Sequence, residues 1–234
     1  MTKVSSDELV ISSNISTEKT SATQLLSYSP KTTPNSSFLT PNYQNGDSFM
    51  DENTLKVLSE LEKTQKDFWN VSRASANFLS MLIKISGAKK VVEVGTSNGY
   101  SGIWIAKALK ETGGKRSRLT TIEYYEKRIE LALENFKKCG VDDIITIKQG
   151  SACDVLETVE YGIDFAFIDA NKSEYINYFE LIDPKLRSGG IIAADNITSH
   201  ADKVAPFVEK IKSDPNYQVE ILNLPGGMLL GYKL

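Results

Sequence analysis

The stretch Val91-Val92-Glu93-Val94-Gly95-Thr96-Ser97-Asn98-Gly99-Tyr100-Ser101 decides the fold. It opens with a short β-branched run, which is typical of a buried strand. It then passes through two glycines into a segment with the apolar periodicity of a helix. Glycine lets the backbone approach a ligand closely, and the start of the helix offers unpaired N–H groups. The stretch therefore predicts a strand, a cofactor-binding loop and a helix in succession.

The spacing of the two glycines indicates the kind of cofactor. From Glu93 to Gly99 the pattern reads Glu-x-Gly-x-x-x-Gly. A dinucleotide fingerprint has the pattern G-x-G-x-x-G, but Ser97 occupies the position of its middle glycine. An acidic residue two positions before the first glycine suits a cationic ligand better than a pyrophosphate. S-adenosylmethionine carries an ammonium and a sulfonium group, so it fits this pattern.

Composition divides the chain of 234 residues into two parts. Residues 1–47 are rich in Ser, Thr and Asn and carry three prolines, so we expect a disordered leader. A targeting peptide is the alternative, but an apolar core is absent and no arginine precedes Arg73. We expect one domain over 48–234, with N-terminal helices over 48–88 and a Rossmann-like α/β core over 89–234.

Hydrophobic periodicity predicts the elements of that domain. A helix begins near Asp51 and a second spans about 72–86. From residue 90 onward strands and helices alternate, which is typical of a parallel sheet covered on both faces. Strands are expected near 90–94, 118–123, 143–148, 163–168, 190–194, 217–223 and 227–233, and helices near 101–112, 126–138, 153–159, 173–187 and 201–213. The last two strands follow one another directly, so they predict an antiparallel hairpin. The predicted fold class is α/β, a doubly wound Rossmann-like sheet.

Strand ends predict the rest of the cofactor site, because ligands of doubly wound sheets bind at the carboxyl ends of the strands. Glu123 ends the second strand and can accept both ribose hydroxyls, although a solvated strand-end charge is the alternative. Small residues after the third strand would let an adenine ring lie against the backbone. The expected cofactor contacts are Glu93, Gly95, Thr96, Ser97, Gly99, Tyr100, Ser101, Glu123, Tyr124, Ser151, Ala152 and Asp169.

Three oxygen donors follow the fourth and fifth strands. Asp169 ends one, and the pair Asp195-Asn196 ends the other. Oxygen donors of this kind suit a hard divalent cation such as Mg²⁺, whereas the alternative is that they form local hydrogen bonds and helix caps. Lys172 follows Asp169 by three residues and is expected to be catalytic, because a lysine in such a cleft can take a proton. A surface lysine is the alternative.

Charge and cysteine content bear on partners and location. The net charge of −3 argues against a nucleic-acid partner without excluding one. Two cysteines are expected to be free thiols of a reducing compartment, which predicts a cytoplasmic protein. No apolar run approaches the roughly 18 residues of a membrane span, so no membrane partner is expected. The position of His200 near a helix start favours a surface or capping role. The roles of His200 and Trp69 stay open. Homodimer formation also stays open.

These motifs together resemble those of the metal-dependent class I O-methyltransferases, the group that contains catechol and caffeoyl-CoA O-methyltransferases. The resemblance covers about residues 65–234. It rests on the stretch 93–101, on Phe167-Ile168-Asp169-Ala170-Asn171-Lys172 with Tyr175 beyond, and on Ser188-Gly189-Gly190 leading to Asp195-Asn196. It implies a seven-stranded sheet, S-adenosylmethionine as donor, Mg²⁺ at Asp169, Asp195 and Asn196, and Lys172 as the base or its electrostatic equivalent.

The function expected from this resemblance is methylation of a hydroxyl on a catechol-like small molecule. The chain departs from the family pattern at 197–200 and at Gly226-Gly227, where the acceptor is expected, so the acceptor is left undetermined. Methylation of a hydroxylated tRNA base is one alternative. A nicotinamide-dependent oxidoreductase is a second, and a non-catalytic binding protein with this fold is a third.

Overall fold

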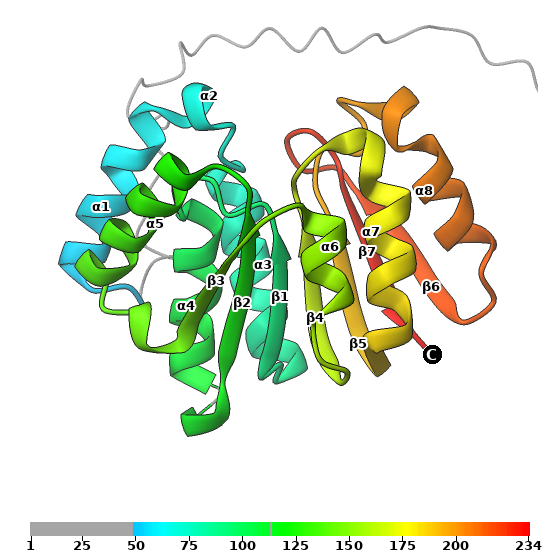
Figure 1. Cartoon of the computed structure of the whole chain (residues 1–234), viewed down its shortest axis with the longest axis horizontal. Coiled ribbons are helices and arrows are strands. Elements are labelled where there is room, and N and C mark those ends of the chain that lie inside the picture. The colour runs from blue at the N-terminus through cyan, green and yellow to red at the C-terminus, as the bar shows by residue number, and fades with distance from the viewer. Residues whose placement is uncertain (1–48, 113) are drawn as a thin grey trace, which may run out of the picture. The chain divides into compact units, whose positions relative to one another are not determined.

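The computed structural model describes residues 49–112 and 114–234. Its seven-stranded sheet has the order β3-β2-β1-β4-β5-β7-β6 (Figure 1). The strands are β1 (Lys90–Val94), β2 (Arg118–Glu123), β3 (Ile145–Gln149), β4 (Ile163–Ile168), β5 (Leu186–Ala194), β6 (Tyr217–Leu222) and β7 (Met228–Lys233). The first five are parallel, and β7 pairs antiparallel with both β5 and β6. The expected doubly wound sheet with its C-terminal hairpin is thereby confirmed.

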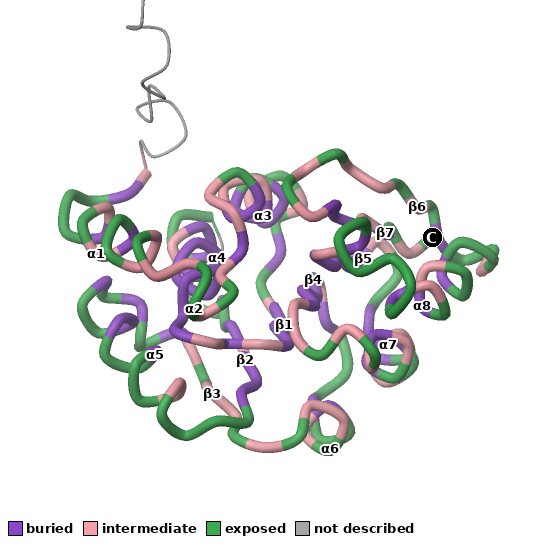
Figure 2. Tube along the Cα trace, turned by 90° about the horizontal axis from the view of Figure 1, so that it is seen from above, coloured by how far each residue is buried: buried purple, intermediate pink, exposed green. Residues whose placement is uncertain are grey.

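Helices cover the sheet from two sides (Figures 1 and 2). Within the described ranges they are α1 (Glu52–Lys63), α2 (Gln65–Phe68), α3 (Arg73–Ser86), α4 (Tyr100–Thr112), α5 (Glu126–Lys138), α6 (Ala152–Glu157), α7 (Tyr175–Ile182) and α8 (Ala201–Ser213). Short 3-10 turns lie at Gly114–Arg116, Asp142–Ile144, Lys172–Glu174 and Asp183–Lys185. One apolar cluster joins the sheet to α1, α3, α4 and α5, and a second joins it to α6, α7 and α8.

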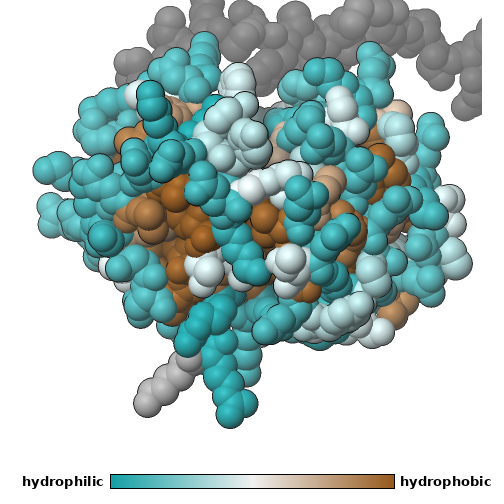
Figure 3. Space-filling view, in the orientation of Figure 1, coloured by the Kyte–Doolittle hydropathy of each residue, from teal (hydrophilic) through white to brown (hydrophobic). Residues whose placement is uncertain are grey.

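The continuous apolar strands explain this double cover. Along β1, Val91 belongs to the first cluster and Val92 to the second, because neighbouring side chains of a strand point to opposite faces. The edge strand β3 is only partly buried. In Figure 3, apolar side chains show between the charged ones on this face, mostly on the side where β2 and β3 lie. The central strands β1 and β4, by contrast, are buried on both faces.

Side-chain caps start the two N-terminal helices. Asp51 accepts a hydrogen bond from the Thr54 amide (2.9 Å) at the start of α1, as its place in the sequence suggests. Ser72 accepts one from the Ser75 amide (3.0 Å) at the start of α3. None of the helices within the described residues is long and apolar enough to cross a membrane.

Three elements differ from their expected bounds. The helix expected over 173–187 ends at Ile182, because Pro184 lies in a separate 3-10 turn and β5 begins at Leu186 rather than near 190. The third strand begins at Ile145, after a 3-10 turn. The short helix α2 carries too few apolar residues to be visible as a periodic pattern. The leader expected over 1–47 lies outside the described residues.

Candidate active site

A cavity of about 580 Å³ opens at the carboxyl ends of the parallel strands. Ten of the residues expected at the site line it, namely Gly95, Thr96, Ser97, Ser101, Glu123, Tyr124, Ser151, Ala152, Asp169 and Lys172. The structure brings these together from the ends of four strands. Glu93, Gly99, Tyr100, Asp195 and Asn196 are not among its lining residues. Gly150, one of the small residues expected after the third strand, lines it too, whereas the sequence analysis did not select Phe68, Asn70, Val71, Tyr125, Arg128, Ala170, Asn171, Glu174 or Tyr178.

The glycine loop passes very close to the end of β4. Gly95 has φ +106°, and a Cβ there would lie 2.2 Å from the Asp169 carbonyl oxygen. The amides of Gly95 and Thr96 both donate to the Ile122 carbonyl at 3.1 Å. Only glycine permits this approach. The loop backbone is therefore fixed against β2 and β4, and it faces the cavity.

Glu123 is held rigidly at the rim of the cavity. Its Oε2 accepts the Ser97 amide (2.9 Å), and its Oε1 accepts the amides of Tyr124 (2.9 Å) and Tyr125 (3.0 Å). A carboxylate can accept about four hydrogen bonds, so three backbone donors leave it capacity for a ligand. This arrangement suits a ligand with hydroxyl groups.

Glu93 lies beneath the glycine loop and is completely buried. Its Oε1 accepts from the Ser101 hydroxyl (2.6 Å) and its Oε2 from the Thr121 hydroxyl (2.7 Å). Burial raises the pKa of Glu93 to about 7. The side chain thus supports the loop from below. Gly99 packs near the ring of Phe136.

Tyr100 also points away from the cavity. It is buried, with an exposed fraction of 1%, and its hydroxyl donates to Glu62 Oε1 of α1 at 2.6 Å.

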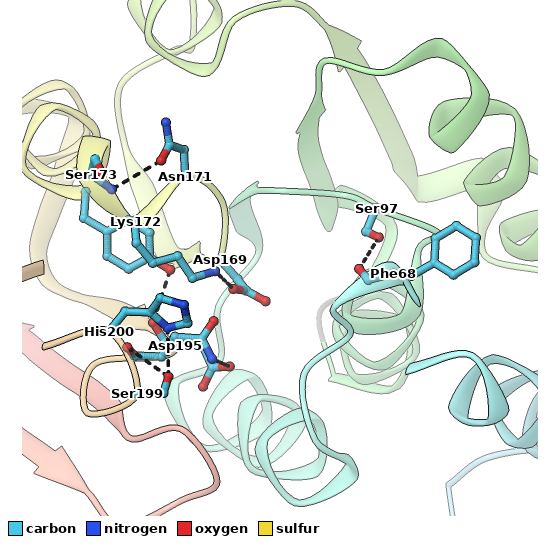
Figure 4. A network of polar contacts seen from close by, with 11 residues as sticks. Phe68, Ser97, Asp169, Asn171, Lys172, Ser173, Asp195, Ser199 and His200 are labelled. Atoms are coloured by element: carbon cyan, nitrogen blue, oxygen red, sulfur yellow. Dashed lines mark hydrogen bonds and ion pairs between the residues drawn. The ribbon is translucent and has the colours of Figure 1, made fainter. Parts of the chain in front are cut away.

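The acidic residues expected to hold a metal lie on neighbouring strand ends. The Asp169 amide donates to the Val94 carbonyl (2.9 Å), and the Asp195 amide donates to the Ile168 carbonyl (3.0 Å). Lys172 Nζ lies 2.8 Å from Asp169 Oδ1. Asn196 has φ +64°, and its Nδ2 donates to Asp195 Oδ2 at 3.3 Å. Figure 4 shows Asp169, Lys172 and Asp195 close together.

The electrostatics of this acidic cluster are unusual. Burial raises the pKa of Asp195 to about 7, and the charge of Asp169 adds to the effect. Burial also raises the pKa of Asp169, against the opposing charge of Lys172. Asp195 Oδ1 is buried and has no hydrogen-bond partner among the described residues. An unpartnered buried oxygen is costly, so this donor set of two carboxylates and one amide fits a hard cation. Within the described ranges, no group of three or more His, Cys, Asp and Glu side chains is arranged as a metal site.

His200 faces this cluster from the loop before α8. Ser199 Oγ lies 3.0 Å from His200 Nδ1, and Figure 4 shows the imidazole between Lys172 and Asp195. The ring is exposed and makes no side-chain cap on α8. The expected surface position of His200 agrees with its exposure. The sequence did not show that the ring also faces the acidic cluster.

An exposed aromatic group lies at the mouth of the cavity. Trp69 has φ +54° and an exposed fraction of 73%. The guanidinium of Arg128 lies 5.4 Å from the centre of its ring and 5.3 Å from that of Tyr125. A bulky residue in the left-handed region is rare, and its place on the cavity wall gives it a candidate functional role.

Comparison with known proteins agrees with this geometry. A sequence model of the O-methyltransferase family matches residues 46–234. The chain is 37% identical to caffeoyl-CoA O-methyltransferase 2 of Zea mays over 65% of its length and 59% of the maize protein. It is 35% identical to a catechol O-methyltransferase of Niastella koreensis over 64% of its length and 67% of that protein.

A solved structure shares the fold. The Bacillus cereus O-methyltransferase, solved in complex with SAH, aligns with a TM-score of 0.71 and 25% identity. The alignment covers 85% of this chain and 94% of that one. The doubly wound sheet and its glycine loop are those of a class I methyltransferase. The chain belongs to the O-methyltransferase family and is an S-adenosylmethionine-dependent enzyme.

Proposed function

We propose that the protein methylates one hydroxyl of a catechol-like small molecule with the help of a divalent cation. The observation that carries the proposal is Asp195 Oδ1, a buried oxygen with no hydrogen-bond partner among the described residues, beside Asp169. A cation would compensate both carboxylates at once. The names of the relatives support the acceptor class, since they are catechol and caffeoyl-CoA O-methyltransferases.

The donor site of this proposal is the wall of the cavity formed by the glycine loop and Glu123. S-adenosylmethionine would lie along the loop from Gly95 to Ser101, with its ribose hydroxyls at Glu123. Ser151 and Ala152 would flank the adenine, next to Tyr124. Three backbone amides already orient the Glu123 carboxylate, so little ordering is needed when a ribose binds. Glu93 acts through Ser101 rather than by contact.

The acceptor site of this proposal is the acidic cluster. Asp169, Asp195 and Asn196 would hold Mg²⁺ or another divalent cation. Such an ion, when bound, supplies positive charge that favours the ionised form of an acceptor hydroxyl. Lys172 Nζ is held at 2.8 Å from Asp169 Oδ1. As the base it would take the hydroxyl proton in its neutral amine form, and as the electrostatic equivalent of a base its ammonium would stabilise the ionised oxygen while the proton passes to solvent. The ionised oxygen would then attack the donor methyl group in line with the sulfonium, so that the O–CH3 bond forms as the S–CH3 bond breaks and S-adenosylhomocysteine leaves. Positioning and electrostatics would supply most of the catalysis.

Location and assembly are further parts of the proposal. Cys139 and Cys153 are free thiols, which favours a reducing compartment such as the cytoplasm. Homodimer formation stays a prediction. It is supported by the exposed apolar side chains of Met81 and Ile85 on α3, which have exposed fractions of 47% and 78%.

The decisive experiment is magnesium-dependent turnover of a vicinal diol, measured beside donor titration. Asp195→Ala should abolish turnover and leave donor affinity within about twofold, because Glu123 ends β2 and Ser151 lies between β3 and α6. Asp169→Ala should also weaken donor binding, because Asp169 lines the donor cavity. Lys172→Ala should lower turnover with equal or tighter metal binding, since a like charge is removed.

The control for charge is Asp202→Ala, which removes an exposed aspartate in the first turn of α8. It should leave turnover unchanged. Full activity in EDTA, or an active Asp195→Ala variant, would show that the acidic cluster is structural and that the reaction needs no cation.

A further inference from the structure

The segment between α1 and α3, which contains α2, covers the donor cavity. We call residues 64–72 the cover loop. Four consecutive residues of it, from Phe68 to Val71, line the same cavity as Gly95 and Glu123. Its tip touches two parts of the donor site. Ser97 Oγ donates to the Phe68 carbonyl at 2.8 Å, and Arg128 stacks on Trp69. The same Ser97 donates its amide to Glu123, so one residue contacts both the cover loop and the acid proposed to bind ribose.

The base of the cover loop is closed by an ion pair. Glu62 lies in the last turn of α1, and Arg73 is the first residue of α3. Arg73 Nη1 lies 2.6 Å from Glu62 Oε1, so the pair joins the two ends of the cover loop. The guanidinium also lies 5.5 Å from the ring centre of the buried Trp104. Closing a loop at its base reduces the conformations open to its tip.

Tyr100 connects this ion pair to the donor loop. It is the first residue of α4 and follows the glycine loop directly. Its hydroxyl donates at 2.6 Å to Glu62 Oε1, the oxygen that Arg73 also contacts. Burial and the neighbouring Glu62 carboxylate hold the pKa of Tyr100 well above its usual value, so the phenol stays a donor. We call Glu62, Arg73 and Tyr100 the clasp.

We propose that the clasp positions the cover loop over the methyl donor, so that Glu62, Arg73 and Tyr100 are positioning residues for donor binding. The proposal rests on the donor site proposed above. None of the three lines the cavity, so they act through the cover loop. The apparent affinity of a ligand falls with the fraction of molecules in its binding-competent state. An intact clasp keeps that fraction high.

The test is Tyr100→Phe, which removes one hydroxyl without changing the shape of the side chain. S-adenosylhomocysteine affinity is measured by calorimetry, and its dissociation rate by stopped flow. Hydrogen bonds to charged groups are the stronger ones, so we expect about tenfold weaker binding, mostly through faster dissociation. The KM for the donor should rise with little change in kcat. Amide exchange should accelerate in peptides over 64–72 and stay unchanged elsewhere. Glu62→Gln should act in the same direction.

A matched control lies at the other end of the same two helices. Lys107 of α4 contacts Asp51, the N-cap of α1, at 2.5 Å. Lys107→Met should lower the melting temperature and leave S-adenosylhomocysteine affinity unchanged. An equal loss of affinity in Lys107→Met and Tyr100→Phe would overturn the proposal, because docking of α1 on α4 would then suffice.

Glu123→Ala separates the two proposals. If it weakens S-adenosylhomocysteine binding while Tyr100→Phe and Glu62→Gln bind like the wild type, the clasp has no positioning role and the donor site stands. If Glu123→Ala binds like the wild type, the donor site itself is wrong, and the clasp proposal falls with it.

Discussion

At the scale of single residues, Glu93 is a completely buried acid beneath the glycine loop. It accepts two short hydrogen bonds, from Ser101 of α4 and Thr121 of β2. The carboxyl therefore joins β1 to the helix that follows the glycine loop. Its elevated pKa has a measurable consequence for stability.

Glu93→Gln should change the pH dependence of stability. The pKa of Glu93 is about 7 in the folded protein against a usual value of 4.5. Between these pH values the native state binds more protons than the unfolded state, so the wild type loses stability as pH rises. Glutamine does not titrate. The unfolding free energy of Glu93→Gln relative to the wild type should therefore rise by about 3 kcal/mol from pH 4.5 to 7.

Urea unfolding at several pH values checks this expectation. Glu130→Gln, a change at an exposed position of α5, should follow the wild-type profile. Parallel profiles for Glu93→Gln and the wild type would contradict the elevated pKa of Glu93.

The sequence predicts the residues of the site that lie at strand ends. It predicts few of the residues that the cover loop contributes. Glu123, Asp169 and Lys172 line the cavity because strand direction alone brings them there. Phe68 and Val71 reach it only because α1 and α3 pack beside α4, a long-range arrangement that no local pattern encodes. Tyr100 shows the reverse case. It follows the glycine loop in sequence, but the helical turn directs its side chain to Glu62.

At the scale of elements, the β6–β7 hairpin holds the loop that carries Asn196. The Ile197 amide donates to the Gly227 carbonyl (3.0 Å), and the amides of Thr198 and Ser199 donate to the Gly226 carbonyl (2.9 and 3.1 Å). Hydrophobic periodicity predicted the hairpin but not this contact. The contact depends on the tip adopting positive φ at both glycines.

Gly227→Ala should disrupt this contact. Gly227 has φ +75°, and a Cβ there would lie 2.6 Å from Thr198 Cγ2 and Oγ1. Backbone strain and overpacking together should cost about 2 kcal/mol or more. Turnover should fall strongly while donor affinity is kept, because the glycine loop follows β1 and is held against β2 and β4. Chemical denaturation and donor titration measure the two effects.

Gly87→Ala is the matched control for the backbone conformation. Gly87 has φ +63° with nothing within 4 Å of its would-be Cβ. It should lose only about 1 kcal/mol and keep its turnover. Equal turnover of the Gly227 and Gly87 variants would show that the hairpin tip does not support the acceptor site.

At the scale of the whole molecule, the family match and the described domain occupy nearly the same part of the chain. The match begins at residue 46, and the N-cap of α1 is Asp51. The expected boundary at residue 48 lies between them. Composition alone set that boundary, because a Ser-, Thr- and Asn-rich segment offers few apolar side chains for a core.

A shortened chain that begins at Ser48 should keep the fold and the donor site. We expect a melting temperature within about 4 °C of the full chain, equivalent to less than about 1 kcal/mol, and unchanged S-adenosylhomocysteine affinity. Thermal unfolding and calorimetry on both chains test this. An insoluble shortened chain, or one that no longer binds, would show that residues before 48 contribute to the domain.

The tip of the β6–β7 hairpin holds residues 197–199 through main-chain atoms, and this has a consequence for how the chain can vary. Amides of residues 197–199 and carbonyls of Gly226 and Gly227 make these contacts, and the exposed Ser199 adds a longer side-chain hydrogen bond to the Asn196 carbonyl (3.4 Å). Substitutions at Ser199 and His200 should leave these main-chain contacts in place. If the proposed function holds, substrate preference should therefore change at these two positions while the donor loop keeps its structure.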